Sequence, residues 1–118
     1  MTAGLNGMAY RVHQIAVDHG FRGTATDHRP IAEHVALIHS EVSEVLEDWR
    51  AGHEPTEVYH KVDDDGREKP CGIPIECADI IIRTLNLCGE YGIDIEQAIA
   101  EKVAFNRTRP WLHGGKRI

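Results

Sequence analysis

Four acidic side chains form two closely spaced pairs in separate stretches of the chain. Glu41 and Glu44 lie three residues apart, and Glu76 and Asp79 have the same spacing. Residues three apart project from one side of an α-helix, so each pair presents both carboxylates to the same neighbour. Hard divalent cations such as Mg²⁺ take several oxygen ligands and can join carboxylates to the phosphates of a substrate. If the two helices face each other, the four side chains are candidate metal ligands.

The acidic pairs also have an ordinary explanation. Such pairs are common on solvated helix faces, and Asp79 and Arg83 have the spacing of a surface ion pair. By helical spacing, Glu41 lies beside Leu37 at the border of an apolar stripe, so that it can be buried against a neighbouring helix. The acids alone leave a metal site and a solvated surface both open.

The last helix that the sequence predicts carries polar residues where packing residues are expected. Ile95, Ala98 and Ile99 define its inward face, and the same spacing continues to Lys102 and Asn106. A lysine on that face either extends its ammonium group to solvent or pairs with negative charge. Carboxylates and a phosphorylated substrate would supply that charge.

The spacing of apolar residues predicts about four helices in a single domain, residues 1–118. The helices are expected over about residues 5–19, 30–51, 75–91 and 94–108, with a short hairpin containing an Asp-Gly turn within 53–74. The expected fold class is therefore all-α, a helical bundle with a hairpin or loop insertion between the two helices that carry the acids. Because 118 residues provide only a modest core, we expect dimerisation to complete the bundle.

Three of these helices have apolar residues that recur at helical spacing. The expected packing residues are Met8, Val12, Ile15, Ala16 and His19 in the first helix, Ile31, Val35, Ile38, Val42, Val45 and Trp49 in the second, and Cys77, Ile81, Leu85 and Cys88 in the third. Trp49 is therefore expected to pack in the core rather than to stack on a nucleotide base.

Composition excludes several classes of function. A net charge of -6 argues against general nucleic-acid binding, which depends on neutralising phosphates with basic side chains. No apolar run approaches the ~18 residues that a membrane span needs. Three cysteines without a recognisable secretory leader favour free thiols, so we expect a cytoplasmic protein. The basic segment 111–118 is expected to be a solvated tail.

Two segments resemble the motifs of a known family. His39–Glu44 (HSEVSE) and Glu76–Asp79 (ECAD) are similar to the ExxE and ExxD motifs of the all-α nucleotide pyrophosphohydrolases, specifically the MazG-like proteins. The similarity continues through residues 92–98 into 101–110, where Lys102 and Asn106 form a KxxxN pattern. It covers roughly residues 30–117 apart from the hairpin region.

The resemblance implies roles for particular residues. It implies that Mg²⁺, with Mn²⁺ as a substitute, is bound by Glu41, Glu44, Glu76 and Asp79. It also implies that phosphates are contacted by Lys102 and Asn106, and, less directly, by Arg109. Many family members have a second glutamate where this chain has Ser40, so the number of metal ions stays open.

The implied activity is Mg²⁺-dependent hydrolysis of a nucleoside triphosphate to its monophosphate and pyrophosphate, a nucleotide-pool housekeeping reaction. Glu41 or Glu44 would orient or deprotonate the attacking water, and Lys102 would offset phosphate charge. The family further implies a homodimer or a dimer of dimers. Two alternatives remain: a non-catalytic helical interaction module, and a phosphoribosyl-ATP pyrophosphohydrolase-like activity on the same fold. The sequence does not indicate which base or sugar is preferred.

Overall fold

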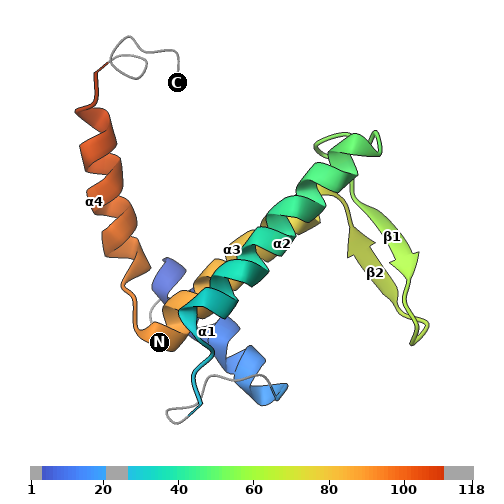
Figure 1. Ribbon diagram of the computed structural model, residues 1–118, viewed down its shortest axis with the longest axis horizontal. Helices are drawn as coiled ribbons and strands as arrows, with labels where there is room; N and C mark the ends of the chain where they lie inside the picture. The colour runs from blue at the N-terminus through green and yellow to red at the C-terminus, as the bar shows by residue number, and fades with distance from the viewer. Residues whose placement is uncertain (1–3, 21–26, 111–118) are drawn as a thin grey trace.

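The computed structural model describes residues 4–20 and 27–110, and the basic segment 111–118 lies outside this range. Four helices and one hairpin follow the predicted order (Figure 1). They are α1 (Gly4–Asp18), α2 (Ile31–Arg50), β1 (Tyr59–Val62), β2 (Glu68–Cys71), α3 (Ile73–Tyr91) and α4 (Ile95–Arg107). The predicted class, a mostly helical chain with a hairpin between the two acid-bearing helices, is confirmed.

Local chemistry explains where the helices begin and end. α3 starts two residues earlier than predicted, at Ile73, because Pro74 is tolerated in a first turn, where backbone N–H groups have no helical acceptor. It ends at Gly92, whose φ of 66° is a left-handed conformation that glycine adopts without steric cost. The side chain of Asp94 then caps α4 by accepting a hydrogen bond from the Gln97 backbone N–H at 3.0 Å.

The hairpin is an antiparallel pair in which Tyr59 lies opposite Cys71 and Val62 opposite Glu68. It extends from the end of the α2–α3 pair that is remote from α1 (Figure 1). The Tyr59 hydroxyl donates a hydrogen bond to Asp48 of α2 at 2.8 Å, and this bond raises the pKa of Tyr59 to about 12. The contact fixes the base of the hairpin to α2.

The core lies where α3 packs against α1, and it is built from small residues. Ala9, Leu85 and Cys88 are buried there, with Ile95 packed alongside. A Cβ atom on Gly89 would lie 2.5 Å from the backbone oxygen of Ala9, so the helices approach more closely than any other residue would permit.

The predicted packing face of α1 was wrong in part, since Val12 and Ala16 are partly buried but the other three residues are exposed. Its buried residues are Gly7, Ala9 and His13, whereas the expected Met8 and Ile15 are 42% and 59% exposed. Hydrophobic spacing identified the large apolar side chains of α1, but only small residues fit where α1 closely approaches α3, so the small ones are buried.

A buried polar pair joins α2 to α3. His34 and Glu90 lie with their side-chain atoms Nε2 and Oε1 3.2 Å apart, and these side chains are 2% and 0% exposed. The second carboxylate oxygen of Glu90 is buried without a hydrogen-bond partner among the described residues. His34 is therefore the side-chain hydrogen-bond partner that the described residues give to this buried carboxyl group.

Two other predictions of packing do not hold within a single chain. Trp49 is 65% exposed rather than buried in the core, and much of the α2 stripe is exposed with it. The expected inward face of α4 is covered only at Ile95, which packs against the core, while Ala98 and Ile99 are exposed. Figure 1 shows α4 extending away from the α2–α3 pair. The radius of gyration is accordingly 17.3 Å, against about 13 Å for a compact domain of this length.

Candidate metal centre

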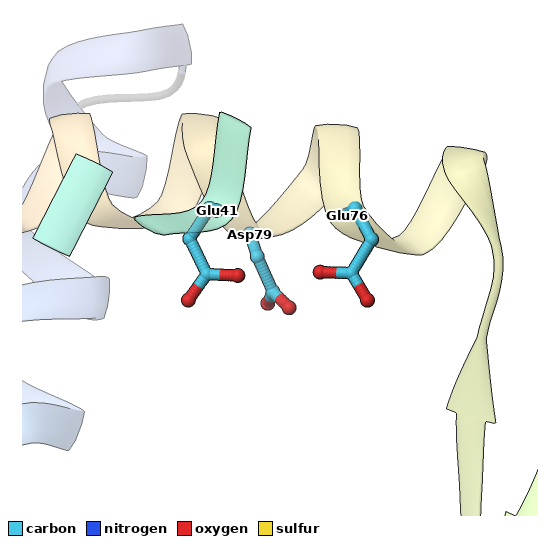
Figure 2. A group of neighbouring side chains, drawn as sticks. All are labelled: Glu41, Glu76 and Asp79. Atoms are coloured by element: carbon cyan, nitrogen blue, oxygen red, sulfur yellow. The ribbon is translucent and has the colours of Figure 1, made fainter. Parts of the chain in front are cut away.

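Three carboxylates from two helices point to the same side of the α2–α3 pair (Figure 2). Glu41 comes from α2, and Glu76 and Asp79 come from α3. One oxygen from each lies within 4.8 Å of the others, and all three side chains are partly buried. We call these three residues the acidic group. The structure thus brings together three of the four acids that the sequence singled out.

The electrostatics of the acidic group show that negative charge is crowded there. The pKa of Glu76 is raised to about 7, first by burial, then by the charge of Asp79 and by the hydrogen bond and charge of Glu41. The pKa of Asp79 is raised by burial and by Glu41, and the positive charges of Arg83 and Lys69 partly oppose the increase. Closely spaced carboxylates cannot all ionise without a compensating cation.

The donor set fits a hard divalent cation. All the side chains of the acidic group offer oxygen, which suits Mg²⁺ or Mn²⁺ rather than the softer metals that nitrogen and sulfur ligands favour. A divalent ion would also relieve the repulsion that raises the pKa of Glu76.

Arg83 does not form the simple surface pair with Asp79 that its spacing allowed. Its Nε–H donates to the Oε1 atom of Glu41 on the other helix at 2.8 Å. The Glu41 side chain is only 13% exposed, so this charge-assisted bond holds it in a defined orientation beside Asp79.

The acidic group lies in a cleft of about 680 Å³. Its lining residues are Val12, Ile15 and Ala16 from α1, Arg29, Ser40, Glu41 and Glu44 from α2 and the segment before it, Lys69 from β2, and Glu76, Asp79, Ile82, Arg83 and Asn86 from α3. Glu44 therefore lines the same cleft but lies outside the acidic group. A volume of this size is typical of small-molecule sites.

Sequence reasoning missed several of the polar residues in this cleft. Arg83 was considered only as a partner of Asp79, and Asn86 was not considered although it follows Asp79 by two helical turns. Lys69 gave no signal, because its position depends on how the hairpin folds back beside α3.

The three predicted phosphate contacts, two on α4 and one just after it, lie elsewhere in a single chain. Lys102, Asn106 and Arg109 are exposed, and none of them lines the cleft. The ammonium group of Lys102 lies 5.0 Å from the centre of the Phe105 ring. Their role as phosphate contacts stays a prediction.

No helix in the described part of the chain is long and apolar enough to cross a membrane. Comparison with known protein families finds no matching family model, and no solved structure matches. One curated protein with a local match is a dATP/dGTP diphosphohydrolase from Cyanophage S-2L, which is 45% identical over 38 residues. The aligned segment covers 32% of this chain and 36% of that protein. The chain is thus similar to about a third of this relative.

Proposed function

We propose that this chain hydrolyses a nucleoside triphosphate to the monophosphate and pyrophosphate, with Mg²⁺ bound by Glu41, Glu76 and Asp79. The observation that carries the proposal is the convergence of these carboxylates, from two helices, within 4.8 Å in a cleft that a nucleotide can enter. Support comes from the local similarity to a protein named for the diphosphohydrolysis of dATP and dGTP. These two nucleotides are therefore the first substrates to test.

The chain's own residues supply positioning, charge and a base. When bound, the divalent ion contributes charge neutralisation and the polarisation of a phosphate oxygen, which is much of what phosphoryl transfer requires. Arg83 holds the Glu41 carboxylate in orientation through its bond of 2.8 Å. Glu44 lines the cleft without joining the acidic group, which leaves its carboxylate to orient an attacking water and accept its proton.

Lys69 is the cation best placed to meet the triphosphate within one chain. Its side chain lines the cleft, and its positive charge, with that of Arg83, partly opposes the increase in the pKa of Asp79. An ammonium group beside the acidic group offsets charge on the outer phosphates. We expect Lys69→Ala to raise KM for the triphosphate more than it lowers kcat.

A second copy of the chain is part of the proposal. The accessible surface is 8895 Å², against about 6,400 Å² for a compact monomer of this mass. The excess is larger than the ~800 Å² that each partner buries in a standard interface. Exposed apolar residues lie on the helices left uncovered, namely Val42, Leu46 and Trp49 on α2 and Ile99, Val103 and Phe105 on α4. Pairing through these faces would give a homodimer, or a dimer of dimers, in which α4 of one copy carries Lys102, Asn106 and Arg109 toward the cleft of the other.

Pyrophosphate release with and without Mg²⁺, measured across ordinary nucleoside triphosphates and phosphoribosyl-ATP, tests the proposal. Glu41→Gln and Asp79→Asn each remove a proposed metal ligand, and we expect activity to fall by about a hundredfold or more. The matched control is Glu47→Gln, which makes the same chemical change on α2 at a side chain that is 62% exposed and paired with Arg50.

Two results would contradict the proposal. Equal activity in the wild type, both ligand variants and the control would exclude the acidic group as the metal site. An absence of turnover with every nucleotide, in Mg²⁺ and in Mn²⁺, would favour a helical interaction module instead.

A further inference from the structure

The cleft has two chemically different ends, which lie at opposite ends of the stretch of α3 that lines it. One end holds the acidic group and Lys69 of β2. The other is formed by Val12, Ile15 and Ala16 of α1 and by Ile82 and Asn86 of α3, with Arg29 beside the end of α3, where its carbonyl accepts a hydrogen bond from Tyr91. Figure 1 shows α1 and the hairpin at opposite ends of α3, and in Figure 2 β2 adjoins the Glu76 side of the acidic group while α1 lies on the Glu41 side. A ligand with a charged part and an apolar part would therefore lie in one direction only.

The distance between the two ends matches the parts of a nucleotide. Asp79 and Asn86 are seven residues apart on α3. Seven residues span about 10 Å of helix and return to within about 20° of the same face. A base at Asn86 can thus belong to the same molecule as phosphates at the acidic group.

The apolar end offers surface for a base but little for a phosphate. The described residues that line it from α1 are all aliphatic, and Ile82 of α3 lines the same cleft. The charge of Arg29, which also lines the cleft, is paired with Glu33 at 3.6 Å. Such walls favour the faces of a planar heterocycle and disfavour a charged group, which would lose its hydration there.

Asn86 is held so that it presents a hydrogen-bond donor. The Nδ1–H group of His13, a residue only 8% exposed, donates to the Oδ1 atom of Asn86 at 3.0 Å. The amide oxygen is therefore engaged. Within residues 4–20 and 27–110 the Asn86 amide NH₂ donates no hydrogen bond, and the side chain lines the cleft. A partly buried donor without a protein partner is suited to an acceptor on a ligand.

We propose that the base of the substrate lies between α1 and α3, where the Asn86 amide donates a hydrogen bond to an acceptor on its edge, while the triphosphate points toward Lys69. This inference rests on the proposed function for the identity of the ligand. Asn86 would then be a binding residue, and the bond from His13 would position it.

The test separates nucleoside binding from phosphate binding and does not depend on turnover. Calorimetry measures the affinity of the whole chain, with Mg²⁺, for the α,β-methylene analogue of dATP and for inorganic tripolyphosphate. Asn86→Asp keeps an oxygen for His13 but removes the NH₂ donor, and Gln14→Glu is the matched control on the exposed side of α1. We expect Asn86→Asp to weaken binding of the analogue by about tenfold and to change that of tripolyphosphate by less than about twofold. The control should change neither.

Purine analogues in which one ring nitrogen is replaced by CH then identify the acceptor. One analogue should bind to the wild type about tenfold more weakly than the unmodified nucleotide does, and yet bind to Asn86→Asp as tightly as the unmodified nucleotide. That analogue lacks the ring nitrogen that the Asn86 amide contacts. Thermal unfolding confirms that the variant folds, and Asn86→Ser repeats the test if it does not.

Three results would overturn the inference. They are an equal loss of affinity for the analogue and tripolyphosphate, unchanged affinity for the analogue, and a loss that follows deletion of the sugar hydroxyl rather than a ring nitrogen. A wild-type chain that binds the analogue through Asn86 but releases no pyrophosphate from dATP would refute the proposed function and leave this inference standing. A wild type that binds no nucleotide would refute both.

Discussion

Binding of Mg²⁺ to the acidic group is expected to release a proton from Glu76. Burial and the neighbouring carboxylates raise the pKa of this residue to about 7, so near neutrality half of the molecules carry a proton there. A metal ion binds the carboxylate form, and it must therefore displace that proton. For one displaced proton, the apparent affinity for Mg²⁺ falls by about tenfold for each pH unit below the pKa and is constant above it.

The raised pKa of Glu76 also makes the stability of the metal-free protein depend on pH in a defined direction. The folded-state pKa of Glu76, about 7, lies above the ordinary value of 4.5 for a glutamate side chain. Between these two values the folded chain binds more protons than the unfolded chain, so the free energy of unfolding decreases as pH rises through this range. The contribution of Glu76 is fully present below 4.5 and is lost as pH passes the folded-state value. Added Mg²⁺ should offset the loss, because it binds the ionised form.

Isothermal titration calorimetry with Mg²⁺ in two buffers of different ionisation enthalpy measures both the affinity and the number of protons released. We expect about half a proton per ion at a pH near 7 and close to one proton a unit lower. Glu76→Gln should weaken binding and remove most of this pH dependence, while Glu47→Gln, at an exposed position outside the cleft, should behave as the wild type. An affinity that is flat with pH, or a full pH slope retained in Glu76→Gln, would refute the reasoning.

Three further predictions concern the fold and the assembly. Gly89→Ala places a Cβ 2.5 Å from the Ala9 carbonyl oxygen, so chemical denaturation should show a loss of about 1–3 kcal/mol; an unchanged midpoint would mean that the helices are not in this close contact. His34→Leu leaves the buried Glu90 carboxylate without its partner and should lower the free energy of unfolding by about 3–5 kcal/mol. The double variant with Glu90→Leu should recover much of this loss, and additive losses would argue against the pair. Phe105→Asp places a charge on the exposed apolar face of α4 and should shift sedimentation from dimer toward monomer; a wild type that sediments as a monomer would contradict the proposed assembly.

Much of the fold follows from local rules that can be read along the chain. The left-handed Gly92 and the Asp94 cap separate α3 from α4 at the predicted place. The Asp-Gly turn correctly indicated the hairpin, in which Gly66 has a φ of 80°. These features depend on a few neighbouring residues, so the sequence suffices to predict them.

Burial was predicted less well, because hydrophobic spacing gives the apolar side of a helix but not what covers it. Leu85 and Cys88 are buried as expected, since α3 packs against a neighbour within the same chain. Trp49 and Ile99 lie on equally apolar faces, yet they are 65% and 42% exposed because no described element of this chain lies over them.

The sequence by itself determined the composition of the candidate site: the i,i+3 spacing places Glu76 and Asp79 on one side of α3, whatever the rest of the chain does. Only the tertiary structure decided that Glu41 joins them, that Glu44 stays on the wall of the cleft, and that Lys69 rather than Lys102 is the lysine in this cleft. The physical reason is one of range. Helical spacing fixes neighbours within a few residues, whereas the distance between side chains on different elements depends on how the elements pack. Here the packing of α2 along α3 brings Glu41 to Glu76 and Asp79, and the folding back of the hairpin brings Lys69 beside them.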